Sequence, residues 1–317
     1  MTSAPPTFDD VLRAAERLRG RVHRTPVMTS ATADRELGAR VAWKCENLQK
    51  VGAFKARGAL NAVLALEGDA AARGVVTHSS GNHAAALAWA AAQRSAPCTV
   101  VMPHTAPAVK VAAVRGYGAA IEFCEQRERE QVCAAVQQRT GAVMVHPFES
   151  TDVIAGQGTA ALELLEEVPD LDLVVVPVGG GGLCAGTALT VGAVQPAARV
   201  LAAEPLAVDD AARSLATGVR QPRVDGAKTW GDGLMTGLGA VNFAVLRATG
   251  VRVVTVTEDE IVTAARFFLE RMKLVVEPSA ATVLAALRAI RGELRGLRVG
   301  AVLSGGNTDF RWLERGA

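Results

Sequence analysis

The chain of 317 residues alternates between two hydrophobic periods, one typical of helices and one typical of strands. Apolar residues recur every three or four positions over Phe8–Arg21 and Ala31–Leu37, which predicts an amphipathic helix in each segment. We expect further helices over Gly58–Leu66, Ala106–Arg115 and Gln126–Gln138, an alanine-rich helix after His83, and one beginning at Gly156.

Short apolar runs bounded by turn residues predict the strands. They cover Val41–Glu46, Gly74–His78, Cys98–Met102, Ala119–Cys124, Val143–Pro147, Leu173–Val178, Arg199–Glu204, Val251–Val256 and Leu297–Leu303. Because helical segments separate most of these runs, we expect parallel pairing, and the pattern predicts an α/β fold. Leu173–Val178 is apolar throughout, which predicts a strand buried on both faces.

The composition favours a globular protein large enough for two domains, with 50% hydrophobic and 21% charged residues. The net charge is +2 and no basic run is interleaved with aromatic residues, so we expect no nucleic-acid partner. Residues 1–6 lack the segments of a signal peptide, and no apolar run is long enough to span a membrane. We therefore predict a cytoplasmic protein. Five cysteines without paired spacing indicate neither disulfides nor a zinc site.

Lys55 is the candidate reactive residue, because it lies between an aromatic residue and small neighbours in the segment Gly52–Ala59. Only six of the 34 basic residues are lysines, so arginine supplies charge elsewhere in this chain. Burial lowers the pKa of a lysine and makes its amine a nucleophile suited to Schiff-base chemistry. For an isolated lysine, the ordinary interpretation is a helix start whose amine reaches water.

Four consecutive glycines, Gly179–Gly182, follow the buried strand and precede a helix. Backbone amides can converge there on a phosphate, and the helix dipole favours negative charge. The same unit satisfies the dinucleotide fingerprint G-x-G-x-x-A through Gly180, Gly182 and Ala185, with Glu204 placed as the ribose-binding acid. From this unit alone, phosphate binding, nicotinamide binding and a tight structural turn all remain open.

Two further turns follow predicted strands. Ser79–His83 offers hydroxyls, an amide and free helical N–H groups that could hold a substrate carboxylate, although an ordinary helix cap explains the same residues. His83 fits a structural histidine as well as a proton shuttle. Ser304–Asn307 follows the last strong strand. With Lys55 and the glycines, these turns match pyridoxal phosphate, which requires a lysine, phosphate-binding amides and a partner for its ring nitrogen.

These motifs, in this order and spacing, resemble the serine/threonine dehydratase and serine racemase family of fold-type II pyridoxal-phosphate enzymes. The resemblance rests on Gly52–Ala59, Ser79–His83, Val178–Leu183, Ser304–Asn307, Arg24–Val27, Ile154–Thr159 and Glu277–Ala281. It implies an α/β fold like that of the tryptophan synthase β subunit, with two open twisted domains and the cofactor in the cleft between them. Residues 1–67 and 149–317 would form the large cofactor-binding domain, and residues 68–148 the small substrate-binding domain.

The resemblance also implies roles for individual residues. Lys55 would bond to the cofactor and act as a catalytic base, Phe54 would pack on the ring, Asn82 would meet the 3-hydroxyl, and Ser304 the ring nitrogen. The phosphate would be held by Gly179, Gly180, Gly181, Gly182 and Leu183. The substrate would be bound by Ser79, Ser80, Gly81 and His83, with Ser80 also catalytic as a proton carrier.

The implied activity is β-elimination, which converts a β-hydroxy amino acid such as L-serine or L-threonine to a 2-keto acid and ammonia. Alternatives on the same site are serine racemase and 3-hydroxyaspartate dehydratase; a nicotinamide-dependent oxidoreductase and a non-catalytic ligand-binding protein are alternatives from other classes. Ala84–Ala85 omits the glutamine usual in the family after His83, and Ala53 stands where many members have serine, so the substrate stays unassigned. We expect a homodimer.

Glu204–Asp210 follows a predicted strand and places acidic side chains on both sides of a short loop. Two carboxylates and a backbone carbonyl suit Mg²⁺ or Ca²⁺, whereas the acidic residues could instead favour the start of a helix. The resemblance favours the metal ion. In the family the corresponding positions bind such an ion, which implies Glu204, the carbonyl of Val208 and Asp210 as its ligands.

Overall fold

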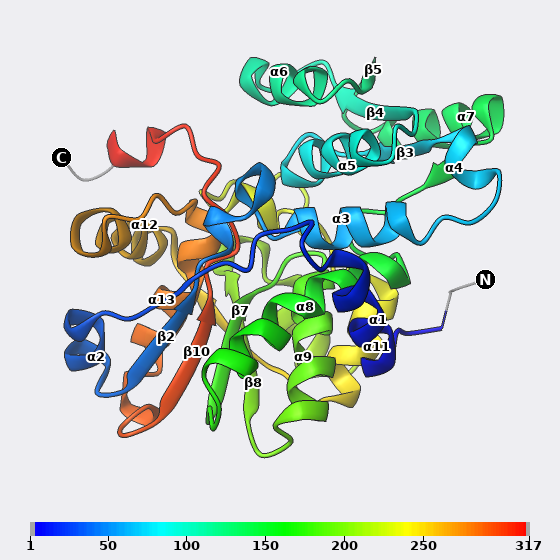
Figure 1. Cartoon of the computed structure of the whole chain (residues 1–317). Helices are drawn as coiled ribbons and strands as arrows, with labels where there is room; N and C mark the ends of the chain where they lie inside the picture. The colour runs from blue at the N-terminus through cyan, green and yellow to red at the C-terminus, as the bar shows by residue number, and fades with distance from the viewer. Residues whose placement is uncertain (1–3, 315–317) are drawn as a thin grey trace.

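The computed structural model describes residues 4–314 and contains two parallel sheets (Figure 1). The larger sheet has the order β1-β2-β10-β7-β8-β9, and only β1 runs antiparallel to its neighbour. Its strands are β1 Val27–Met28, β2 Arg40–Lys44, β7 Leu173–Pro177, β8 Arg199–Pro205, β9 Arg252–Val256 and β10 Arg298–Val302. The first three residues, which belong to the segment examined for a signal peptide, lie outside this description.

Successive side chains of a strand point to opposite faces, so the larger sheet has a core on each side. Val175 packs with one core and its neighbours Val174 and Val176 with the other. Helices cover both faces, as parallel sheets require. One layer contains α2 Ala31–Leu37, α12 Glu258–Phe267 and α13 Pro278–Ala289; the other contains α8 Thr151–Glu167, α9 Gly182–Val194, α10 Asp210–Thr217 and α11 Ala240–Ala248.

The smaller sheet has the order β5-β4-β3-β6 and is parallel throughout. Its strands are β3 Val75–His78, β4 Cys98–Pro103, β5 Ala120–Cys124 and β6 Val143–Met144. Its helices are α4 Ala70–Arg73, α5 Asn82–Gln93, α6 Ala108–Gly116 and α7 Arg129–Thr140. Because all of these elements lie within residues 68–148, we propose those residues as the limits of a small domain.

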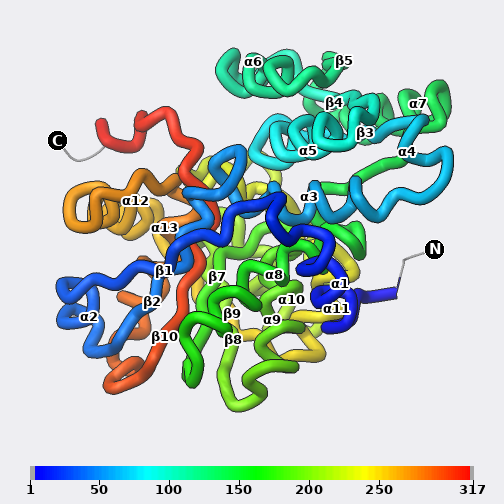
Figure 2. Tube along the Cα trace, viewed as in Figure 1, coloured from blue at the N-terminus to red at the C-terminus, as the bar shows by residue number. Residues whose placement is uncertain are grey.

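The helix α3, Lys55–Leu64, lies between the two sheets and packs against α5 on one side and α8 on the other (Figure 2). The helix α1, Phe8–Leu18, also packs on α8. Gly156 lies so close to α3 that a Cβ atom there would stand 2.6 Å from the Cα of Gly58. Small residues therefore let the two helices cross closely.

The predicted helix start at Gly156 is wrong, because this close packing of helices was not visible in the sequence. We expected a helix to begin at Gly156, but α8 begins at Thr151 and continues through Gly156 and Gly158. Glycine usually weakens a helix interior, yet here both glycines face neighbouring backbones, since a Cβ at Gly158 would stand 2.9 Å from the carbonyl oxygen of Gly186. Close helix packing overrides the local propensity.

The predicted strands and their parallel pairing are confirmed, with ends that differ by a few residues, and one strand is an exception. The run Val143–Pro147 forms only the two-residue strand β6, and a turn replaces its second half. The short antiparallel strand β1 was not expected. Within residues 4–314, the helices are too short or too polar to cross a membrane.

Candidate active site

Four predicted motifs lie at the carboxyl ends of strands or directly at a helix start. The segment Ser79–Gly81 connects β3 to α5, Gly179–Gly181 connects β7 to α9, and Ser304 follows β10. Ligands of open α/β sheets bind at these carboxyl ends. Lys55 is the first residue of α3, which lies between the two sheets.

The amine of Lys55 is held by a backbone carbonyl. Its Nζ atom donates a hydrogen bond to the carbonyl oxygen of Pro147 at 2.8 Å and lies 5.1 Å from the centre of the Phe54 ring. Burial lowers the pKa of Lys55 to about 8, while the charge of Glu277 opposes this shift. The amine therefore loses its proton more readily than that of an ordinary lysine, as a nucleophile or base requires.

Backbone hydrogen bonds join the lysine motif to Ser304–Asn307. The amide of Phe54 donates to the carbonyl of Ser304 at 2.9 Å, and the amide of Gly306 donates to the carbonyl of Gly52 at 2.9 Å. Gly52 has a φ of 69°, which favours glycine, and Val51 has a φ of 55°, which is rare for a β-branched residue. The chain thus holds a strained turn directly before Lys55.

The glycines after β7 are enclosed by other parts of the chain. Gly181 has a φ of 91°, and a Cβ atom at Gly180 would stand 2.3 Å from the ring of Phe148. The carbonyls of Gly180 and Phe148 both accept hydrogen bonds from Nδ2 of Asn242, at 2.6 and 2.8 Å. The fold therefore requires glycine at Gly180 for packing, in addition to any role in binding phosphate.

The predicted cofactor contact Asn82 is held by groups from the larger sheet. Its Nδ2 atom donates to both carboxylate oxygens of Glu277 at 3.1 and 3.0 Å, and its Oδ1 accepts from Asn307 at 3.0 Å. Burial raises the pKa of Glu277 to about 7, although the bond from Asn82 opposes the shift. Glu277 was not predicted as a site residue, although the motif Glu277–Ala281 contains it.

The side chain of His83 is directed into the smaller sheet. Its Nε2 donates to the carbonyl of Val145 at 3.1 Å, and its Nδ1 is buried without a hydrogen-bond partner among residues 4–314. Burial lowers the pKa of His83 well below its ordinary value, so the ring is neutral. The ring of His83 is thus engaged with Val145, whereas Ser79 stays in the turn, where its hydroxyl accepts from the amide of Gly81 at 3.3 Å.

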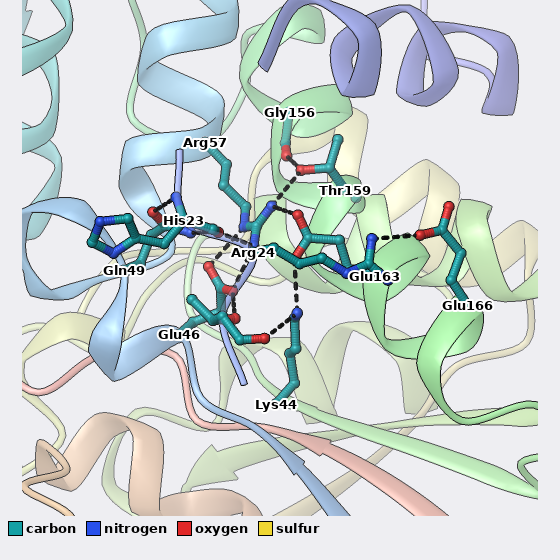
Figure 3. Close-up of polar contacts among 12 residues, drawn as sticks. His23, Arg24, Lys44, Glu46, Gln49, Arg57, Gly156, Thr159, Glu163 and Glu166 are labelled. Atoms are coloured by element: carbon teal, nitrogen blue, oxygen red, sulfur yellow. Dashed lines mark hydrogen bonds and ion pairs between the residues drawn. The ribbon is translucent and has the colours of Figure 1, made fainter. Parts of the chain in front are cut away.

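A buried cluster of four charged side chains fixes the other side of α3 (Figure 3). The guanidinium of Arg57 donates to both carboxylate oxygens of Glu46, at 2.7 and 2.8 Å, and to both of Glu163, at 2.7 Å each. Lys44 also pairs with Glu163, at 2.7 Å, and donates to the carbonyl of Thr25. Arg57, Lys44 and Glu46 have no exposed surface.

This cluster gives a structural reason for several motifs of the sequence. Thr25 belongs to Arg24–Val27, Arg57 lies two residues after the reactive lysine, and Thr159 of the Ile154–Thr159 motif accepts from Arg57 at 3.3 Å. Two positive and two negative charges balance one another inside the protein, where each alone would be costly. The motifs therefore anchor α3, and with it Lys55, to the larger sheet.

The predicted metal ligands are brought together, but their carboxylates already accept backbone hydrogen bonds. Glu204 accepts from the amides of Ala211 and Ala212 at 2.9 and 2.8 Å, and Asp210 accepts from Leu238 at 2.7 Å. Burial raises the pKa of Glu204 to about 8 and also raises that of Asp210. Within residues 4–314, three or more His, Cys, Asp or Glu side chains never gather as a metal-binding group.

The residues present suit pyridoxal phosphate. Ser304 is buried and follows β10 at the carboxyl end of the larger sheet, and Ser80 lies in the turn before α5. The hydroxyl of Ser304 suits a ring nitrogen, the glycine turn at the start of α9 is available to a phosphate, and the Lys55 amine is available to an aldehyde.

Comparisons with known proteins identify the family. The model of the family described as "Pyridoxal-phosphate dependent enzyme" matches residues 18–305. The chain is 43% identical to the serine racemase of Dictyostelium discoideum over 98% of this chain and 97% of that enzyme. It is 45% identical to the beta-hydroxyaspartate dehydratase of Paracoccus denitrificans, covering 96% of this chain and 97% of that enzyme.

Solved structures agree with this assignment. The crystal structure of the T.th. threonine deaminase superposes with a TM-score of 0.91 at 42% identity, covering 96% of this chain and 99% of that one. The chain therefore belongs to the pyridoxal-phosphate dependent enzymes, within the group of serine and threonine dehydratases and serine racemases.

Proposed function

We propose that this protein is an ammonia-lyase that eliminates water from a β-hydroxy amino acid, such as L-serine or L-threonine, and yields a 2-keto acid and ammonia. Pyridoxal phosphate would supply an electron sink for the bond broken at the substrate Cα. Its phosphate would be held by Gly179–Gly182 and Leu183, its ring by Phe54 and Asn82, and its ring nitrogen by Ser304.

The observation that carries this proposal is the state of Lys55. A carbonyl acceptor at 2.8 Å holds the amine in one place, and burial lowers its pKa to about 8. An amine with a pKa near the working pH is suited to take a proton from the substrate Cα. Ser304 offers a neutral hydroxyl, not a carboxylate, which favours loss of a β leaving group over transamination.

A keto-acid release assay tests the proposed function. The substrates are serine, threonine and 3-hydroxyaspartate, each as both enantiomers, with alanine as a control that lacks a β leaving group. We expect keto acid from at least one β-hydroxy amino acid and none from alanine. If the cofactor-loaded protein releases no keto acid from the whole panel, the proposed function is wrong.

The comparisons favour 3-hydroxyaspartate as a second candidate substrate, because the chain is 45% identical to the beta-hydroxyaspartate dehydratase of Paracoccus denitrificans over 96% of this chain. The keto-acid assay separates the two candidates. A higher kcat/KM for 3-hydroxyaspartate than for serine and threonine would support this candidate, and no keto acid from 3-hydroxyaspartate would remove it.

We also propose a divalent cation, Mg²⁺ or Ca²⁺, held by Glu204, Asp210 and the carbonyl of Val208. The oxygen ligands are of the type these ions prefer, and each carboxylate oxygen keeps a second lone pair beside its backbone hydrogen bond. Both carboxyl groups have raised pKa values because of burial and neighbouring negative charge. A cation would compensate that charge and stabilise the start of α10.

A further inference from the structure

The turn His146–Glu149 contacts both the reactive lysine and the glycines of the predicted phosphate site. The carbonyl of Pro147 accepts the hydrogen bond from Lys55, and the ring of Phe148 fills the space beside Gly180. The carboxylate of Glu149 accepts from the amide of Ala240 at 2.5 Å, at the start of α11. The 146–149 turn thus lies between the two halves of the candidate site.

One imidazole holds the 146–149 turn from the inside. The Nδ1 atom of His146 accepts hydrogen bonds from the amides of Phe148 and Glu149, at 3.3 and 3.1 Å. Because Nδ1 accepts two N–H groups, it carries no proton, and the neutral ring has its proton on Nε2. The ring also contacts Phe148 edge-on, with centres 4.6 Å apart.

Burial is the main reason that this ring is neutral, and the charged groups around it act in both directions. Burial, then the charges of His78 and Lys55, lower the pKa of His146 to about 4, and Glu130 opposes the shift. Glu149 stands on the same turn, 4.0 Å from Nε2. Nδ1 therefore remains an acceptor at neutral pH. An open cavity of about 310 Å³, lined in part by His78, His146 and Glu149, adjoins the turn.

We infer that His146 is a positioning residue: by accepting two amides at Nδ1, it fixes the turn whose Pro147 carbonyl holds the amine of Lys55. The inference rests on the proposed function, since it concerns the base of that reaction. A misplacement of about 1 Å in a catalytic group can cost about a hundredfold in rate. Without the two bonds to Nδ1, the turn keeps its contacts through Phe148 and Glu149 with Asn242 and Ala240, but it loses the bonds that close it around Pro147, so the Pro147 carbonyl is held less firmly.

Three substitutions of His146 distinguish the effect of losing the hydrogen-bond acceptor at Nδ1 from the effect of changing the size of the side chain. In His146→Asn the amide oxygen can occupy the place of Nδ1, in His146→Gln the amide reaches the place of Nε2, and His146→Leu has no acceptor. We expect His146→Asn to keep kcat within about threefold of the wild type, and His146→Gln and His146→Leu to lower it at least tenfold, as for a misplaced group. KM should change much less than kcat. His104→Leu, an exposed histidine of the smaller sheet, serves as the control for loss of an imidazole.

Affinity for pyridoxal phosphate, measured by equilibrium dialysis of the cofactor-free variants, gives a readout independent of turnover. We expect the variants to rank in cofactor affinity as they do in kcat. His146→Gln and His146→Leu should bind pyridoxal phosphate at least fivefold more weakly than the wild type, because the turn also packs on Gly180. If all three variants fold and show equal kcat and equal cofactor affinity, the inference is wrong. If the wild type releases no keto acid, the proposed function fails, but the order of cofactor affinities still decides the role of His146.

Discussion

The amide of Phe54 donates to the carbonyl of Ser304 at 2.9 Å, so the segment before the reactive lysine is tied directly to the predicted partner of the ring nitrogen. Ala53 and Gly305 form a β-bridge beside this bond. Ser304 follows β10 of the larger sheet, and Arg57 anchors the helix that follows Phe54. Lys55 and Ser304, the predicted partners of the cofactor, are therefore held near each other by the backbone, whatever the position of the smaller sheet.

Lys55→Ala should abolish both turnover and covalent retention of the cofactor, because the other buried lysine, Lys44, is paired with Glu163 at 2.7 Å and lies in the buried cluster. Reduction with borohydride followed by mass spectrometry measures how much cofactor becomes permanently attached. The matched control is Lys228→Ala, since Lys228 is exposed. Cofactor attached in undiminished amount to the Lys55→Ala protein would assign the reactive amine to another lysine.

Ser80→Ala should suppress formation of D-serine, and elimination from D-serine, more than elimination from L-serine. Racemisation needs a proton carrier on the face of the substrate Cα opposite Lys55, and Ser80, the predicted carrier, lies in the turn before α5. Chiral chromatography measures the D-serine formed from L-serine, and keto-acid release measures elimination from each enantiomer. An equal loss of all activities would indicate carboxylate binding instead of a role on one face.

Arg57→Met should lower the free energy of unfolding by about 3–5 kcal/mol, because it leaves two buried carboxylates, Glu46 and Glu163, without their main partner. Arg252→Met is the matched control. Arg252 pairs with Glu293 on the surface, with both side chains about half exposed, so its loss should cost less than about 1 kcal/mol. Urea unfolding measures both values, and a similar cost for the two variants would contradict the role given to the buried cluster.

The metal-free protein should become less stable as the pH rises from about 6.5 to about 8. The pKa of Glu204 is about 8 in the folded protein and 4.5 ordinarily, so in this interval the folded state binds more protons than the unfolded state. Below pH 6.5 the lowered pKa values of His83 and His146 act in the opposite direction, because there the unfolded state binds more protons at these two residues. Mg²⁺ or Ca²⁺ should offset this loss and raise Tm most clearly near pH 8. Thermal unfolding with and without a chelator measures the effect, using Asp210→Ala as the variant expected not to respond.

If chelation leaves both Tm and activity unchanged at pH 8, the proposed metal site is wrong. Glu204 then acts only as the acceptor for the amides of Ala211 and Ala212 at the start of α10. The decline of stability with pH would still be expected in that case, because it depends on the burial of the carboxyl group and not on the ion. Glu204→Gln should reduce the decline but not abolish it, because burial also raises the pKa of Glu277 to about 7.

The sequence was sufficient for the parts of the site that local chemistry defines. Glycines between a buried strand and a helix, and a lysine among small residues, carry their chemistry in their own side chains or backbone, so Gly179–Gly182 and Lys55 could be proposed as site residues from the sequence, and they stay predictions. The parallel pairing followed from the alternation of strands and helices. The homodimer and the cytoplasmic location stay predictions.

The remaining parts depend on contacts between distant segments. Pro147 contributes a backbone carbonyl, which every residue possesses, so nothing in the local pattern marks it as the acceptor for Lys55. His146 appeared only as part of an apolar run. The helix start expected at Gly156 was wrong because the close approach of Gly58, nearly a hundred residues earlier in the chain, decides which conformation that glycine adopts.

The place of β10 in the larger sheet affects how the chain can be synthesised. This strand, Arg298–Val302, lies between β2 and β7, whereas the four strands of the smaller sheet are contiguous in sequence. On the ribosome, the smaller sheet can form while the apolar edges of β2 and β7 still lack their common neighbour. Those edges stay exposed until β10 has been made and has paired with both, so the nascent chain is most prone to aggregation before that point.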